Sequence, residues 1–135
     1  MKSYPIRENH LFVKAYSRGK KSVEKTVVVY VLKDLHAKRL QHAHPQKKRI
    51  NRVGLTVSKR IGGAVQRNRV KRIIREGLRL TQREYVLKTG FLLVIVARDA
   101  ALQAKSTQIQ RDLISALRRL DMLETRTENQ EAQIC

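Results

Sequence analysis

Residues 52–80 limit the possible folds of this chain more than any other segment. Within residues 52–58 every second side chain is apolar, which is the pattern of a strand with one buried face. A pair of glycines separates this strand from residues 64–80, where apolar and basic positions occupy opposite sides of a helical wheel. A strand followed directly by an amphipathic helix predicts a domain in which helices pack on a sheet.

The predicted helix at residues 64–80 has one apolar face and one basic face. The apolar positions are Val70, Ile73, Ile74, Gly77 and Leu78. The polar positions opposite or beside them are Arg67, Asn68, Arg69, Lys71, Arg72, Arg75 and Arg79. A solvated helix normally mixes Glu with Lys so that successive turns form ion pairs, and here only Glu76 is available. We therefore interpret the basic face as a surface for phosphate groups rather than as a solvated face.

The charge of the whole chain supports this interpretation. The 135 residues carry a formal net charge of +19. Residues 1–75 contain 21 basic and 3 acidic side chains, whereas residues 76–135 contain 9 and 8. Between Asp34 and Glu76 there are 13 Lys or Arg residues and no carboxylate. A positive field of this size predicts a polyanionic partner, for which nucleic acid is the leading candidate and an anionic membrane surface the alternative.

Periodicity predicts four further elements. Residues 8–18 have helix length and stop at Gly19, residues 26–32 form a β-branched strand, and residues 91–97 form a buried strand covered by helices on at least one face. A helix opens at Ser106 as its N-cap and has an apolar stripe. The stripe consists of Ile109, Leu113, Ala116, Leu117, Leu120 and Leu123. The segments form one domain over residues 1–123.

Two segments lack an apolar period. Residues 33–51 form a long excursion between strands, with a helical stretch near residues 35–40 as an alternative. His42 and His44 within it suggest a metal site less strongly than a solvated loop, because no cysteine or carboxylate lies nearby in sequence. Residues 124–135 are predicted to be a disordered tail.

Several functional classes are disfavoured by composition. No stretch approaches the roughly 20 apolar residues of a membrane-spanning helix, and the first residues lack the pattern of a signal peptide. The single cysteine, Cys135, excludes an intramolecular disulfide. These features lead us to expect a soluble protein of the cytoplasm. The four aspartates Asp34, Asp99, Asp112 and Asp121 are scattered, which argues against a protein nuclease that uses two metal ions.

The stretch RVGLTVSKRIGGAVQRNRVKRIIRE, residues 52–76, resembles the signature of the bacterial ribonuclease P protein subunit. The resemblance extends to residues 9–19, to the strand through Tyr30 and to residues 93–98. It therefore covers most of residues 5–120.

The resemblance implies both a fold and a function. The fold is an α+β single-domain sandwich similar to a ribosomal-protein domain, with a mixed sheet and a left-handed β-α-β crossover through the basic helix. The function is to bind the catalytic RNA of ribonuclease P and the 5′ leader of precursor tRNA, so that endonucleolytic cleavage leaves the mature 5′ end. In this family magnesium ions held mainly by the RNA carry the chemistry, the protein contributes no catalytic side chain, and neither a membrane nor a protein oligomer is required.

The resemblance also assigns residues. Arg67, Asn68 and Arg69 match the Arg-Asn-Arg motif that faces the catalytic RNA, and Lys71, Arg72 and Arg75 continue its basic face. Lys59 and Arg60 precede the helix in matching positions. Phe12, Tyr16 and Tyr30 match the aromatic side of a cleft for the single-stranded leader, although Tyr16 stands where some relatives carry Phe.

Without the resemblance, Phe12 and Tyr16 would be interpreted as a core stripe, since four-residue spacing places both rings on one helix face. A ribosomal or general RNA-binding protein without a part in processing remains the alternative function. A helix-turn-helix DNA-binding protein is a third and weaker one, because the basic helix offers only phosphate-binding residue types.

Overall fold

The computed structural model describes residues 3–6, 9–34 and 51–124. The strands are β1 (Ser3–Pro5), β2 (Lys20–Val23), β3 (Val27–Lys33), β4 (Asn51–Thr56) and β5 (Phe91–Ala97). The helices are α1 (Asn9–Arg18), α3 (Ala64–Glu84) and α4 (Ser106–Arg119), and two short 3-10 helices are η1 (Lys59–Ile61) and η2 (Asp99–Gln103). The predicted excursion, apart from its ends, and almost all of the predicted tail lie outside the described residues.

The strands form one mixed sheet in the order β1-β4-β5-β3-β2. β4 pairs in parallel with both β1 and β5, whereas β3 is antiparallel to β5 and to β2. The three strands predicted from the sequence are the three central ones. Sequence reasoning missed the edge strands, because β1 has three residues and ends in proline, and β2 begins with two lysines.

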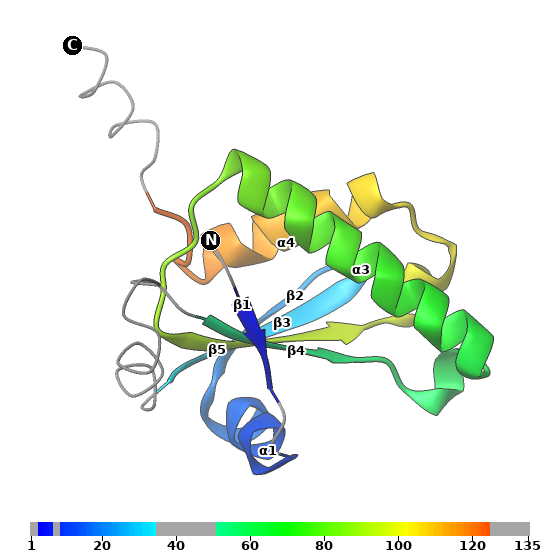
Figure 1. Ribbon diagram of the computed structural model, residues 1–135, viewed down its shortest axis with the longest axis horizontal. Helices are drawn as coiled ribbons and strands as arrows, with labels where there is room; N and C mark the ends of the chain where they lie inside the picture. The colour runs from blue at the N-terminus through cyan, green and yellow to red at the C-terminus, as the bar shows by residue number, and fades with distance from the viewer. Residues whose placement is uncertain (1–2, 7–8, 35–50, 125–135) are drawn as a thin grey trace.

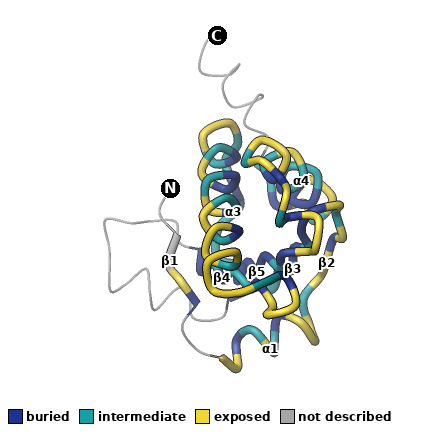
Figure 2. The backbone as a smooth tube through the Cα atoms, turned by 90° about the vertical axis from the view of Figure 1, so that its right-hand side faces the viewer, coloured by how far each residue is buried: buried dark blue, intermediate teal, exposed yellow. Residues whose placement is uncertain are grey.

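The connection from β4 through α3 to β5 is a left-handed crossover. α3 lies on the upper face of the sheet in Figure 1, and Figure 2 shows β5 on the α4 side of β4. Parallel β-α-β units are right-handed in almost all proteins. The α+β fold with this unusual crossover, which the family resemblance implied, is therefore confirmed.

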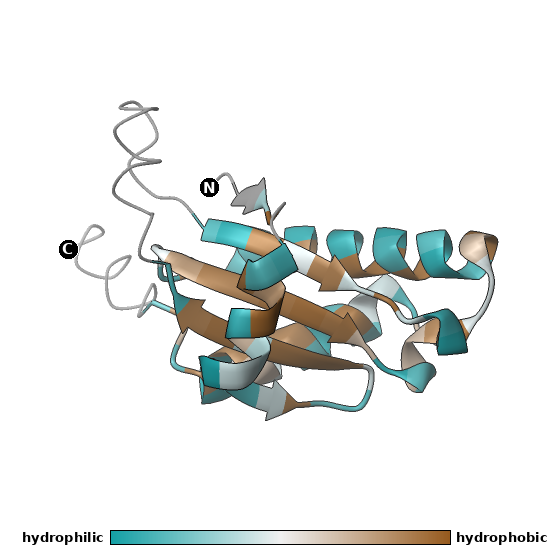
Figure 3. Cartoon of the chain, turned by 90° about the horizontal axis from the view of Figure 1, so that it is seen from below, coloured by the Kyte–Doolittle hydropathy of each residue, from teal (hydrophilic) through white to brown (hydrophobic). Residues whose placement is uncertain are grey.

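Helices cover the sheet on both faces (Figure 1). The upper face packs under α3 and α4, and its central row comprises Val31, Leu93 and Val53 on neighbouring strands. The lower face packs against α1, and Figure 3, seen from below, shows the apolar central strands behind that helix. β5 is thus buried from both sides, which explains its continuous apolar run.

α3 and α4 pack closely because Gly77 lacks a side chain. A Cβ at this position would lie 2.6 Å from Cγ2 of Ile109 on α4, well inside van der Waals contact. Both residues are buried in the larger apolar core. This contact fixes how α3 lies over the sheet, and therefore where its basic face points.

The start and end of α4 differ from the prediction. Ser106 is the first helical residue, and the N-cap is Lys105, whose backbone N–H donates to the Gln108 side chain at 2.9 Å. The hydroxyl cap predicted at Ser106 is therefore wrong by one position. Leu123, predicted to continue the apolar stripe, lies beyond the helix and pairs with Leu87 in an isolated bridge.

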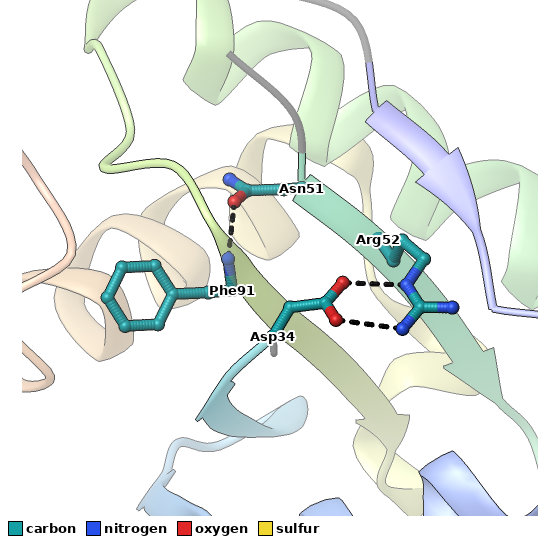
Figure 4. A network of polar contacts seen from close by, with 4 residues as sticks. All are labelled: Asp34, Asn51, Arg52 and Phe91. Atoms are coloured by element: carbon teal, nitrogen blue, oxygen red, sulfur yellow. Dashed lines mark hydrogen bonds and ion pairs between the residues drawn. The ribbon is translucent and has the colours of Figure 1, made fainter. Parts of the chain in front are cut away.

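A polar network joins the ends of the strands on either side of residues 35–50 (Figure 4). Arg52 on β4 donates to the carboxylate of Asp34 at 2.6 and 2.8 Å, and both side chains are at least 90% buried. Asn51 accepts from the backbone N–H of Phe91 at 3.0 Å. Arg52, one of the 13 cations of the carboxylate-free window, is therefore turned inward and paired, because the fold brings Asp34 next to it from the end of β3.

The described helices include none that is long and apolar enough to cross a membrane.

We expect Arg52→Met to lower the free energy of unfolding by about 3 kcal/mol, because it leaves the buried carboxylate of Asp34 without its guanidinium. The double variant Asp34→Leu, Arg52→Met should recover much of that loss. Urea denaturation measures both, with Arg60→Met as the control, since the exposed pair of Arg60 with Asp99 contributes little. An Arg52→Met protein as stable as the parent would contradict a stabilising role for the buried ion pair of Asp34 with Arg52.

Candidate nucleic-acid interface

Three aromatic side chains lie together on the α1 face of the sheet. Phe12 and Tyr16 come from α1, and Tyr30 comes from β3. The rings of Tyr16 and Tyr30 meet edge to face, with centroids 5.0 Å apart and an interplanar angle of 72°. Tyr16 is 40% exposed, and the other two are half-buried. The sequence-predicted trio is thus gathered on one face, with part of its ring surface open to solvent.

The hydroxyl of Tyr16 fixes the direction of its ring. This oxygen lies 2.9 Å from Oγ1 of Thr56 on β4, and either group can donate the hydrogen bond. Tyr30, which the ring contacts, lies on β3 on the other side of β5. The Tyr16 side chain is therefore held on both sides of the central strand, and a ring held in this way loses less entropy when a base stacks on it.

Gly54 provides the space in which the Phe12 ring lies. A Cβ on Gly54 would be 2.5 Å from Cε1 and 2.6 Å from Cζ of Phe12. The sheet register places Gly54 in one row with Val94 and Tyr30, so the ring packs on the backbone of β4 where a side chain would otherwise stand. A glycine inside a strand is a known sign of such close approach.

α3 presents its basic residues on the side turned away from the core. Its buried residues are Val70, Ile74, Gly77, Leu78 and Thr81. The exposed polar residues include Asn68, Arg69, Arg72 and Arg75, while Arg67 and Lys71 are half-buried on the flank of the helix. Figure 2 shows the exposed side of α3 facing away from α4. The two-sided helix predicted from the sequence is confirmed, although Ile73 is only half-buried.

Lys59 and Arg60 form the approach to this helix. Both belong to η1 directly before α3, and both are exposed. Arg60 lies 3.4 Å from Asp99, with both side chains more than 70% exposed. A pair so open to solvent is screened by salt and leaves Arg60 available to another anion.

Most of the basic surface has no internal counter-charge. Arg79 binds Glu76 through two hydrogen bonds, and this contact lowers the pKa of the Glu76 carboxyl. Apart from Arg60, the basic residues predicted to bind RNA have no ion-pair partner among the described residues. These residues are Lys59, Arg67, Arg69, Lys71, Arg72 and Arg75. Their charges are therefore free to attract an external polyanion.

The guanidinium of Arg67 carries an unsatisfied donor. Its Nε is buried and has no hydrogen-bond acceptor within the described part of the chain. An unsatisfied buried donor costs about 1–3 kcal/mol.

The four aspartates are used at separate places. Asp34 binds Arg52, Asp112 accepts two hydrogen bonds from Thr26, Asp121 pairs with Lys88, and Asp99 lies near Arg60. Among the described residues no group of three or more His, Cys, Asp or Glu side chains gathers in one place. His42 and His44 lie outside the described residues.

Sequence reasoning missed Gly54 and Thr56 as parts of the aromatic site. The signal for Gly54 is the glycine itself, which lies inside a strand between Val53 and Leu55. Thr56 gives no such signal, because threonine is common in strands for reasons of backbone preference alone. The contact of Thr56 with Tyr16 becomes visible only in the folded structure, where β4 lies beside α1.

A family model and curated relatives of similar sequence point to the same protein family. A family model described as Ribonuclease P matches residues 1–121. The ribonuclease P protein component of Clostridium botulinum is 36% identical over 119 residues, which cover 88% of this chain and 96% of that protein. The corresponding component of Clostridioides difficile is 32% identical over 117 residues, covering 87% and 91%.

Solved structures show the same similarity. The RNase P protein of Staphylococcus aureus superposes with a TM-score of 0.68 at 27% identity, covering 91% of this chain and all of that one. The RNase P protein of Thermotoga maritima gives a TM-score of 0.63 at 22% identity, covering 82% of this chain and 92% of that one, and supports the fold alone.

We expect Gly54→Ala to move the ring of Phe12 away from β4 while the protein stays folded, because the clashing atoms are at the end of a side chain that can rotate. The ring resonances of Phe12 in an NMR spectrum should shift. In the control Gly63→Ala, the added Cβ meets only the end of the Gln66 side chain, and the Phe12 signals should stay in place. Unchanged Phe12 signals in Gly54→Ala would refute the close contact.

Proposed function

This chain belongs to the ribonuclease P protein family, and we propose that it binds both the catalytic RNA of ribonuclease P and the 5′ leader of precursor tRNA. Membership makes it a protein subunit of an enzyme that processes tRNA. The division of contacts between the two RNAs is our proposal. For a bacterial tRNA-processing subunit, the proposed place of action is the cytoplasm.

The observation that carries the proposal is the unpaired positive charge along η1 and α3. Lys59, Arg69 and Arg72 are exposed and have no carboxylate partner among the described residues. Each such cation that neutralises a phosphate releases condensed counterions, so several of them together bind a folded RNA at cellular salt. We therefore assign this surface to the catalytic RNA.

The aromatic trio supports the second contact. A leader differs in sequence from one precursor tRNA to the next, so a protein that serves many leaders needs contacts that tolerate any base. Stacking on aromatic rings meets this need and contributes about 1–3 kcal/mol per base. The partly open rings of Phe12, Tyr16 and Tyr30 suit single-stranded RNA, whose bases are free to stack.

The residues of the protein bind and orient RNA in this proposal and do not carry the chemistry. The aspartates of the described part are held by separate partners, so they do not fit a shared site for metal ions. We place the magnesium ions that activate water for hydrolysis on the RNA subunit. The leader is released and the tRNA keeps its mature 5′ end.

We expect Phe12→Ala to weaken binding of precursor tRNA to the reconstituted holoenzyme by about tenfold, because one stacking surface is lost. Binding of mature tRNA, which has no leader, should change by less than twofold. Val13→Ala is the matched control, since Val13 lies on the same helix and is 58% exposed. Equal losses for precursor and mature tRNA would instead favour a general RNA-binding protein.

We expect Arg67→Ala, Arg69→Ala and Arg72→Ala each to weaken binding of the protein to the catalytic RNA. Each should also reduce the slope of log K against log salt by about one contact, roughly 0.7–0.9. Titrations at several salt concentrations measure this slope. Arg111→Ala on α4 is the control for loss of one exposed charge elsewhere. Slopes equal to that of the parent would remove these residues from the phosphate-binding surface.

A further inference from the structure

A cavity of about 350 Å³ lies where the turn between β2 and β3 meets η2 and the first half of α4. Its polar lining residues include Lys25, Gln103, Gln108, Arg111 and Asp112. Figure 2 shows β2 and α4 on the side of the molecule away from the exposed side of α3. Neither the aromatic trio nor the basic residues proposed for the catalytic RNA line this cavity. The proposed function therefore leaves it without a role.

The Asp112 carboxylate in this cavity is held in place through one of its oxygens. Oδ2 accepts hydrogen bonds from the backbone N–H of Thr26 at 2.9 Å and from the Thr26 hydroxyl. Thr26 is only 4% exposed, so its donors are fixed within the fold. The other oxygen, Oδ1, has no hydrogen-bond partner among the described residues. Asp112 therefore presents a positioned acceptor for the N–H or O–H of a ligand.

Two cations line the same cavity without neutralising this carboxylate. Lys25 comes from the turn between β2 and β3, Arg111 comes from α4, and both are exposed. Within the described part of the chain, neither cation forms an ion pair or a hydrogen bond, with Asp112 or with any other residue. The cavity thus offers one place for a negative group and another for a hydrogen-bond donor. A ligand that carries both fits it better than a simple anion, which the carboxylate repels.

Amide and alanine side chains complete the wall. Gln108 accepts the backbone N–H of Lys105 at 2.9 Å through Oε1, which leaves its amide nitrogen as a donor. Gln103 makes no hydrogen bond to another described residue. Ala100 and Ala104 also line the cavity, and their small side chains leave room for a flat ring.

We propose that this cavity binds a free mononucleotide whose base carries an amino group. The phosphate lies against Lys25 and Arg111, the base lies over the two alanines, and its amino group donates to Oδ1 of Asp112. A volume of about 350 Å³ falls within the range of small-ligand sites. The inference goes beyond the proposed function, because this nucleotide binds apart from both RNA surfaces.

The carboxylate predicts which bases bind. Guanine, adenine and cytosine each carry an exocyclic amino group that can donate to Oδ1 of Asp112. Uracil has one N–H between two carbonyl oxygens. A carbonyl oxygen beside a carboxylate is unfavourable, because both groups only accept hydrogen bonds. The site should therefore discriminate against uridine nucleotides.

Titration of the full chain with GMP, AMP, CMP, UMP and inorganic phosphate, followed by NMR, tests the site. The amide signals of Thr26, Ala104 and Asp112 should shift and saturate. GMP, AMP and CMP should each bind about fivefold more tightly than UMP or phosphate, because only they donate to the carboxylate. Absence of saturable shifts at these residues would overturn the proposal. Equal binding of AMP and UMP, or of AMP and phosphate, would overturn it as well.

The variant Asp112→Asn tests the role of the carboxylate. It places a donor where Oδ1 stood, while the amide oxygen can still accept from Thr26. The preference should then invert, so that UMP binds more tightly than CMP. An unchanged preference would contradict the contact of Asp112 with the base.

The variant Lys25→Ala tests the phosphate contact. It should weaken binding of AMP, GMP and CMP by about fivefold, because one charge-assisted contact is lost. Lys21→Ala is the matched control, since Lys21 is an exposed lysine of the same hairpin outside the cavity. Equal losses in the two variants would show that Lys25 acts only through the general positive field, and would count against the site.

The holoenzyme distinguishes a free nucleotide from an unpaired nucleotide of an RNA. Radiolabelled AMP should bind the protein in equilibrium dialysis with the same affinity before and after addition of the catalytic RNA and precursor tRNA. Displacement of AMP by either RNA would overturn the assignment to a free nucleotide.

Discussion

β5 packs between helices on both of its faces, and the placement of every proposed RNA contact depends on this packing. Leu93 and Ile95 point into the core under α3 and α4, while Leu92 and Val94 point toward α1. Burial of apolar side chains on both faces stabilises the strand and holds the helices against it. The aromatic residues of α1 and the basic residues of α3 are therefore fixed on opposite sides of one sheet.

This arrangement keeps a strongly charged surface on a stable domain. Like charges along α3 repel each other, and the described residues offer most of them no carboxylate in return. This repulsion is offset by apolar packing on the buried side of α3. There Gly77 allows α4 to pack closely against α3, and Val70 and Ile74 fill the core. Arg52 shows the contrasting case, because a cation of the same window that turns inward is matched by Asp34. A buried cation with an internal partner contributes to the fold, whereas the cations that we propose for RNA binding lie on the surface or on the flank of α3.

The sequence predicted the parts of the fold that periodicity controls. The alternation of Val53 and Leu55 and the apolar run of residues 91–97 identified the central strands, and the two-sided wheel identified α3. The edge strands β1 and β2 were not predicted, because short polar segments show no hydrophobic periodicity. The left-handed crossover was expected only from the family resemblance. Pairing across the sheet, as between Asp34 and Arg52, depends on strand order, which no local pattern in this chain reveals.

In the candidate site, too, the sequence pattern did not predict which way each individual side chain faces. The helical wheel placed Lys71, Arg72 and Arg75 together on one basic face, with Arg67 on its flank. On the folded helix, Arg72 and Arg75 are exposed, whereas Arg67 and Lys71 are half-buried on the flank of the helix. Adjacent residues on a helix point about 100° apart, so neighbours in a motif can face different partners. A motif that is continuous in the sequence can therefore present residues of different exposure on different sides of one helix.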